Sequence, residues 1–101
     1  MTSDIVIVGA GGFGREVLQY VRDTFTDPSA YRVKGFLDDA PRELAGVELG
    51  ADLLGDTLGY EVRARDAFLV AVGSPALRRS LSCRLTERGA RFLTLVHPRA
   101  Y

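Results

Sequence analysis

IVIVGAGGFGRE, residues 5–16, joins a strand to a helix through a glycine-rich turn. The first four residues are β-branched, which is typical of a strand buried on both faces of a parallel sheet. At the spacing of Gly9, Gly11 and Gly14, the first glycine permits a tight turn and the second lets the backbone approach a pyrophosphate, while the third lets the helix pack on the strand. Since a helix start presents free amides and the positive end of its dipole, this stretch predicts a cradle for a phosphate group.

The helix expected over residues 12–25 supports the interpretation of this glycine pattern as a phosphate-binding turn. With 11 glycines in 101 residues, such a spacing arises easily by chance. The predicted helix, however, gathers an apolar face that can cover a sheet, formed by Val17, Leu18, Val21 and Phe25. The alternative interpretation is a strand-to-helix turn that needs glycine only for close packing.

The rest of the chain completes an alternation of strands and helices. Strands are predicted at residues 31–37, 67–72 and 91–96, with a short strand near residues 53–54 and a poor helix at residues 56–66. A second helix is expected to begin after an N-cap at Ser74, with Pro75 in its first position, and to end before Gly89. This order predicts a single α/β domain over residues 1–101, a Rossmann-like open parallel sheet with the strand order 3-2-1-4-5.

The composition excludes several classes of protein. The 13 basic and 13 acidic side chains cancel, so no charge of one sign favours nucleic acid or an anionic membrane. No apolar run approaches the roughly 20 residues of a membrane span, and residues 1–4 do not resemble a signal peptide, which together predict a cytoplasmic protein. The single cysteine, Cys83, excludes an internal disulfide and a cysteine zinc cluster, and its place in a predicted helix favours a buried, unreactive side chain.

Three segments are expected to meet at the carboxyl edge of the sheet, where open α/β sheets bind their ligands. They are the turn at residues 9–14, the pair Asp38-Asp39 after the second strand, and Gly73-Ser74 after the fourth. An acidic residue after the second strand accepts hydrogen bonds from ribose hydroxyls or from a base N–H. Asp38 comes 24 residues after the last glycine of the turn, close to the usual spacing of about 20. Alternatively, one member of the acidic pair belongs only to a solvated turn.

Two further side chains lie near this edge in the predicted fold. Arg78 sits one turn into the second helix, from which its guanidinium reaches a diphosphate or, alternatively, faces water. Phe13, at the apex of the turn, either lies against a ligand or anchors the helix, and we favour the anchor.

Five segments of the chain resemble one known family. They are IVIVGAGGFGREV, GFLDD, GADLLGD, VAVGSPALRR and FLTLVHPRAY, and their order and spacing agree with the family over essentially the whole chain. The family is the PglD-like N-terminal domain of bacterial sugar O- and N-acyltransferases, which include sialic acid O-acetyltransferases and acetyltransferases of UDP-linked 4-amino sugars. The resemblance implies a domain that binds a nucleotide sugar, commonly a UDP-sugar. It also implies that a trimeric left-handed β-helix follows, binds acetyl-CoA and supplies the catalytic histidine.

The resemblance also implies roles for individual residues. The glycines of the turn face the diphosphate, the acidic pair faces the uridine, and Gly73 and Arg78 face the same pocket. The predicted substrate-binding residues are Gly9, Gly11, Gly12, Phe13, Gly14, Asp38, Asp39, Gly73, Ser74 and Arg78. Phe13 departs from the histidine of many relatives, which removes any polar contact from that side chain.

The chain ends at residues 97–101, HPRAY, where the β-helix of the family begins. His97 is the only histidine, and in the family this position marks the domain junction, with the catalytic histidine further on. No catalytic triad and no metal cluster can be assembled from the other residues. We therefore expect the 101-residue chain to bind substrate without catalysing transfer, to bind no cofactor itself, and to be monomeric.

Two other functions are consistent with the sequence. One is an NAD(P)-binding domain of an oxidoreductase or redox sensor, because the same glycine turn serves nicotinamide dinucleotides. The other is an interaction module without a ligand. The acidic pair and the HPRAY end favour the nucleotide sugar over both.

Overall fold

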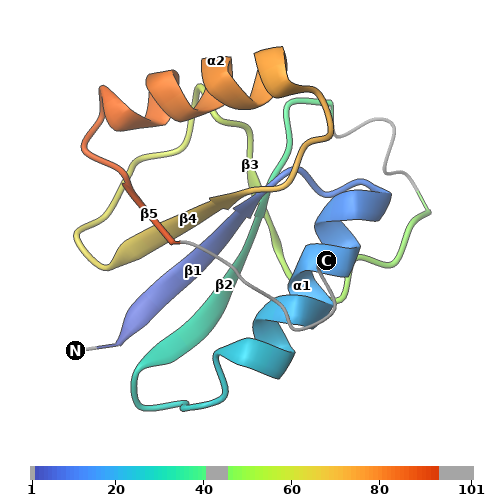
Figure 1. The fold of residues 1–101 in the computed structure, drawn as a ribbon, viewed down its shortest axis with the longest axis vertical. Coiled ribbons are helices and arrows are strands. Elements are labelled where there is room, and N and C mark those ends of the chain that lie inside the picture. The colour runs from blue at the N-terminus through green and yellow to red at the C-terminus, as the bar shows by residue number, and fades with distance from the viewer. Residues whose placement is uncertain (1, 41–45, 94–101) are drawn as a thin grey trace.

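The fold is a parallel sheet with one helix on each face, and the computed structural model describes it for residues 2–40 and 46–93 (Figure 1). The strands are β1 (Ser3–Val8), β2 (Tyr31–Leu37), β3 (Leu53–Gly55), β4 (Asp66–Val70) and β5 (Arg91–Phe92), and the helices are α1 (Gly12–Thr24) and α2 (Pro75–Thr86). All the strand pairs are parallel, and the order across the five-stranded sheet is β3-β2-β1-β4-β5. This confirms the predicted Rossmann-like α/β fold and its strand order.

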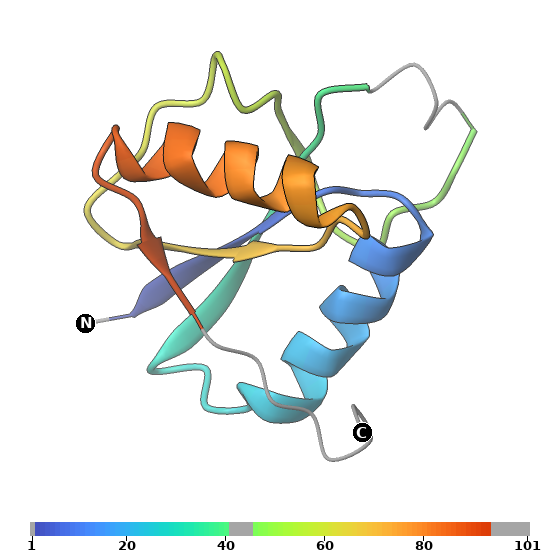
Figure 2. The same ribbon diagram turned by 45° about the horizontal axis from the view of Figure 1, so that its top comes forward.

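Strand β1 lies at the centre of the sheet and is buried on both faces. Ile5 and Ile7 belong to the apolar cluster beneath α1, whereas Val6 and Val8 belong to the cluster beneath α2. The helices contribute the buried residues Val17, Leu18 and Val21 from α1, and Leu81 and Leu85 from α2. Figure 2 shows the two helices on opposite faces of the sheet, with their N-terminal ends near each other beyond the carboxyl ends of β1 and β4.

A bulge in β2 redirects one charged side chain. Two successive residues of β1 pair with Val33 and Gly35, so that Lys34 is an extra residue in this strand. Glycine is required beside it, because φ at Gly35 is +154° and a Cβ there would lie 2.4 Å from the backbone oxygen of Asp52. Since bulges commonly aim a side chain away from the regular pleat, this one explains how a lysine within a strand reaches polar partners.

The segment from residue 56 to residue 65 is not a helix, which corrects the poor helix predicted there. It forms turns at residues 57–59 and 64–65 before it enters β4. The guanidinium of Arg88, from beyond the end of α2, donates to the backbone oxygens of Thr57, Leu58 and Tyr60. The N–H of Tyr60 makes a single-turn bond to the carbonyl of Asp56 at 3.2 Å, and the guanidinium binds carbonyls that no continuing helix satisfies.

Three smaller predictions also need correction. Strand β4 begins at Asp66 and ends at Val70, slightly earlier than predicted. Strand β5 comprises Arg91 and Phe92, while residues 94–96 of the predicted last strand lie outside the described residues, as does His97. Cys83 is exposed, because α2 packs on the sheet through only two buried leucines.

Candidate functional site

The turn after β1 requires glycine at two positions. Gly9 adopts a φ of +104°, a conformation that residues with a side chain rarely adopt. A Cβ on Gly14 would lie only 1.8 Å from the backbone oxygen of Gly9. The start of α1 therefore packs directly on the end of β1, which confirms the tight turn and the close helix packing predicted for these glycines.

The middle of the turn is open. Among the described residues beyond its chain neighbours, none has an atom within 4 Å of a Cβ placed on Gly11, and the nearest atom to one on Gly12 is the Nη2 of Arg15 at 3.9 Å. Gly11 is the N-cap of α1 and provides no side-chain hydrogen bond to the helix. Because the first amides of a helix have no intrahelical partner, those of α1 can receive an anion.

Asp38 connects the turn to the end of β2. Its Oδ2 accepts the N–H of Ala10 at 2.8 Å, and its Oδ1 accepts the N–H of Ala40 at 2.7 Å. The N–H of Gly9 adds a bond to the carbonyl of Leu37 at 2.7 Å. The carboxylate predicted after the second strand therefore lies against the glycine turn, and it keeps lone pairs for a further donor because each oxygen can accept two hydrogen bonds.

Asp39 is held by a different set of partners. Its Oδ1 accepts the N–H of Thr57 at 2.7 Å, and its Oδ2 accepts the hydroxyl of the same residue at 2.9 Å. The Nη1 of Arg84 lies 3.3 Å from that Oδ2 and donates to the Thr57 Oγ1 at 2.7 Å. Neither aspartate is therefore part of a merely solvated turn. Thr57 and Arg84 are absent from the predicted site, because they lie 18 and 45 residues from Asp39 and match no local pattern.

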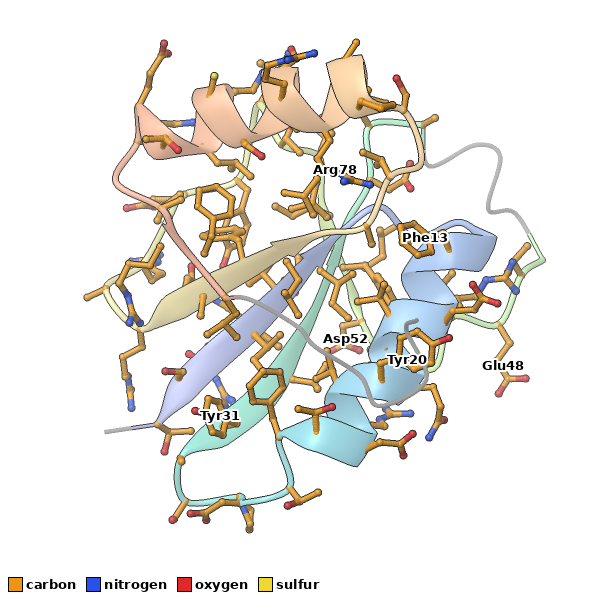
Figure 3. All side chains as sticks on the ribbon, in the orientation of Figure 1. Phe13, Tyr20, Tyr31, Glu48, Asp52 and Arg78 are labelled. Carbon is orange, nitrogen blue, oxygen red and sulfur yellow. The ribbon has the colours of Figure 1, made fainter. Side chains whose placement is uncertain are left out.

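The segment between β4 and α2 borders the site on the other side. Ser74 is the N-cap of α2, as predicted, and its Oγ accepts the N–H of Leu77 at 3.2 Å. Arg78 donates from its Nη2 to the carbonyl of Val72 at 3.0 Å. Its guanidinium therefore lies back along the segment, beneath α2 (Figure 3). Gly73 is exposed in the same segment.

A cavity of about 170 Å³ opens between the turn and α2. It is lined by Val8, Gly9, Leu37, Asp38, Asp39, Ala40, Thr57, Val72, Leu77 and Leu81. Apolar side chains form most of this wall, and its polar side chains are two carboxylates and one threonine hydroxyl. The structure thus brings Gly9, Asp38 and Asp39 together around one cavity. The other predicted site residues lie on the neighbouring turn and on the start of α2.

Phe13 is not the helix anchor that we favoured from the sequence. It is 45% exposed and belongs to neither apolar cluster. Figure 3 shows its ring at the start of α1, on the side of the segment between β4 and α2. The ring therefore lies at the mouth of the site and not in the core.

A second polar cluster lies at the amino end of β4. The fully buried carboxylate of Asp66 accepts hydrogen bonds from the Nζ of Lys34 at 3.0 Å, the hydroxyl of Tyr60 at 2.7 Å and the N–H of Arg63 at 2.8 Å. Burial acts to lower the pKa of Lys34, but its bonds to Tyr60 and Asp66 outweigh burial and raise the pKa above 10.5. Burial, together with the neighbouring carboxylate, raises the pKa of Tyr60 above 10.0. Since these groups satisfy one another, the cluster stabilises the fold.

Within residues 2–40 and 46–93, no group of three or more potential metal ligands is found. In the same part of the chain, neither helix has the length and apolar character that crossing a bilayer requires.

The sheet order and the glycine turn define a Rossmann-like α/β domain with its candidate site at the carboxyl ends of β1, β2 and β4. A family model described as the PglD N-terminal domain matches residues 4–85. Because this match covers most of the chain, the protein belongs to that family, the N-terminal domain of sugar acetyltransferases, and the resemblance seen in the sequence is confirmed. A search of curated proteins finds no match to the chain.

Proposed function

We propose that this domain binds a nucleotide sugar, namely a UDP-linked amino sugar, and presents the sugar for acetyl transfer. In this proposal a C-terminal β-helix domain of the parent enzyme binds acetyl-CoA and performs the chemistry. The observation that carries the proposal is the open turn of α1 beside a cavity with carboxylates in its wall. Membership of the PglD N-terminal domain family supports it.

The diphosphate is assigned to the turn. Gly11 and Gly12 leave space in front of the first amides of α1, and these amides with the helix dipole favour an anion. Arg78 stands on the facing segment with its guanidinium bound only to a carbonyl in the described structure. Because a charge-assisted bond to phosphate is stronger than one to a neutral carbonyl, the ligand is expected to draw this side chain away from Val72.

The base is assigned to the cavity. Its volume of about 170 Å³ is close to the roughly 150 Å³ of an apolar cavity that holds a single benzene ring, so it suits one six-membered ring. The carboxylate of Asp38 is the acceptor for a base N–H or a ribose hydroxyl, because it has fewer donors than that of Asp39. Asp39 instead holds the wall of the cavity through Thr57.

Calorimetric titration of the 101-residue chain with UDP, UDP-N-acetylglucosamine and NAD tests this proposal. We expect both uridine nucleotides to bind and NAD to give no binding heat. Replacing Arg78 by methionine should weaken the binding of UDP by between about tenfold and a hundredfold, since a hydrogen bond to a charged group contributes roughly 1.5–3 kcal/mol. Arg79→Met is the matched control on the next position of α2 and should leave the affinity unchanged. If NAD binds and UDP does not, the domain belongs to the dinucleotide alternative. If none of the three compounds binds, the result favours the interaction module.

A further inference from the structure

Phe13 is exposed at the start of α1, beside the amides to which the diphosphate is assigned. It is the second residue of α1, between Gly12 and Gly14, and 45% of its surface is exposed. A single apolar side chain on a protein surface needs no explanation by itself. Here, however, the neighbouring Gly11 and Gly12 have no side chains that could stand between a ligand and the ring. A group attached to a phosphate on this turn can therefore reach the ring of Phe13.

A second exposed apolar side chain lies at the start of the other helix. Leu77, in the first turn of α2, is 48% exposed and lines the cavity together with Gly9 and Val72. The starts of α1 and α2 lie near each other in both ribbon views (Figures 1 and 2). The ring of Phe13 lies on the side of the β4–α2 segment (Figure 3). The start of α1 therefore presents an apolar side chain near the site, and the start of α2 presents an apolar side chain together with the guanidinium of Arg78.

We propose that Phe13 is the stacking platform for the sugar ring of the bound nucleotide sugar, and so a specificity-determining residue of this domain. This inference rests on the proposed function. The negative face of an aromatic ring attracts C–H groups polarised by neighbouring oxygens, and a pyranose presents such groups on its apolar face. Because the phenyl ring neither donates nor accepts a conventional hydrogen bond, the contact selects sugars by the apolarity of that face and not by hydrogen bonds to their hydroxyl groups.

The test compares UDP with UDP-N-acetylglucosamine on variants of the full 101-residue chain. In the unmodified protein we expect the sugar nucleotide to bind more tightly than UDP. Phe13→Ala should remove about twofold to tenfold of the affinity for the sugar nucleotide, the range expected of one aromatic contact, and leave the affinity for UDP unchanged. Phe13→Tyr retains the ring face and should restore the sugar increment. Leu58→Ala, at a 73% exposed leucine on the segment after β3, is the matched control for loss of an exposed apolar side chain.

An NMR measurement reports the stacking itself. Sugar protons that lie over the phenyl ring should shift upfield on binding, and Phe13→Leu, which keeps an apolar side chain but has no ring current, should abolish this shift. The proposal is overturned if UDP binds but the sugar increment or the upfield shift is absent, or if Phe13→Ala weakens UDP and the sugar nucleotide equally. Failure of UDP itself to bind would instead reject the proposed function and the platform with it.

Discussion

The two ends of the parallel sheet treat their polar groups in opposite ways. At the amino end, the buried carboxylate of Asp66 receives donors from Lys34, Tyr60 and Arg63. At the carboxyl end, α1 begins at an N-cap glycine that offers no side-chain acceptor, and the middle of the turn, at Gly11 and Gly12, is open. A fold gains stability from the first arrangement, because buried polar groups without partners cost free energy.

The difference in hydrogen-bond partners between the two ends indicates where a ligand is expected to bind. Both ends carry aspartates, so composition does not distinguish them. At the amino end, Lys34, Tyr60 and Arg63 supply the donors for the buried Asp66 carboxylate. At the carboxyl end, Asp38 keeps spare lone pairs and the first amides of α1 have no intrahelical partner. Substitutions at the two ends should therefore separate stability from binding, and the following predictions run from the largest expected effect to the smallest.

Gly14→Ala should have the largest effect. The added Cβ would lie 1.8 Å from the backbone oxygen of Gly9, so α1 must move away from β1. We expect the free energy of unfolding to fall by more than about 3 kcal/mol in urea denaturation, with loss of UDP binding. Gly12→Ala is the matched control, because the new Cβ has space and alanine is the better helix former. If both variants kept the stability of the unmodified chain, the close packing at the turn would not matter to the fold.

Asp66→Ala tests the opposite end of the sheet. The substitution leaves three donors without their acceptor and should lower the free energy of unfolding by about 2–3 kcal/mol. This value is smaller than for a fully buried ion pair, because Lys34 is partly exposed. Affinity for UDP, measured where the variant is folded, should not change. Asp4→Asn is the control, because Asp4 lies beside Asp66 on the neighbouring strand. The ion-pair partner of Asp4 is Arg32, whose side chain is largely exposed. Loss of this ion pair should therefore lower the free energy of unfolding by about 1 kcal/mol or less. A marked loss of UDP affinity in Asp66→Ala would break the separation between the two ends.

Arg84→Met should modestly lower both the free energy of unfolding and the affinity for UDP. This arginine holds Asp39 and Thr57 in the cavity wall, and its partly exposed ion pair contributes about 1 kcal/mol or less. We expect a small loss in urea denaturation together with weaker binding of UDP in calorimetry. Arg79→Met, on an exposed face of α2, should change stability by less than about 0.5 kcal/mol. Equal behaviour of the two variants would mean that the cavity wall does not depend on Arg84.

Alkaline pH should have the smallest effect. The pKa values of Lys34 and Tyr60 are raised in the folded protein above 10.5 and 10.0. The protonated forms therefore stabilise the fold, and their contribution is complete below those values and is lost as the pH rises through the folded pKa values. Urea denaturation between pH 8 and pH 11 should show stability falling above about pH 10. The decline should be shallower in Tyr60→Phe, and an equal decline in both proteins would exclude the Tyr60 hydroxyl as a cause.

The sequence predicts those elements whose signals are local. The β-branched run of β1, the apolar face of α1 and the Ser74-Pro75 start of α2 each specify their own structure, and parallel pairing then follows from the order of the elements. The turn is equally local, because the glycine at 14 is required by the backbone of the glycine at 9.

The parts that the sequence does not predict depend on partners far along the chain. The segment after β3 has enough helix-compatible residues to suggest a helix, but the carbonyls of Thr57 and Tyr60 are bound by Arg88, 31 and 28 residues away. In the same way, the engagement of Asp39 depends on Thr57. Phe13 could not be placed from its sequence neighbours because an apolar residue in a helix start faces either the core or the solvent.

Arg88 fastens the segment after β3 through main-chain oxygens, which every amino acid possesses. The attachment is therefore largely indifferent to which side chains the segment carries. The side chains of Thr57 and Tyr60, by contrast, bond Asp39 and Asp66, so these two positions are specific where the Arg88 attachment is not. The segment is thus anchored by main-chain atoms at Arg88 and by side chains at Asp39 and Asp66, and only the first anchor tolerates any amino acid in the segment.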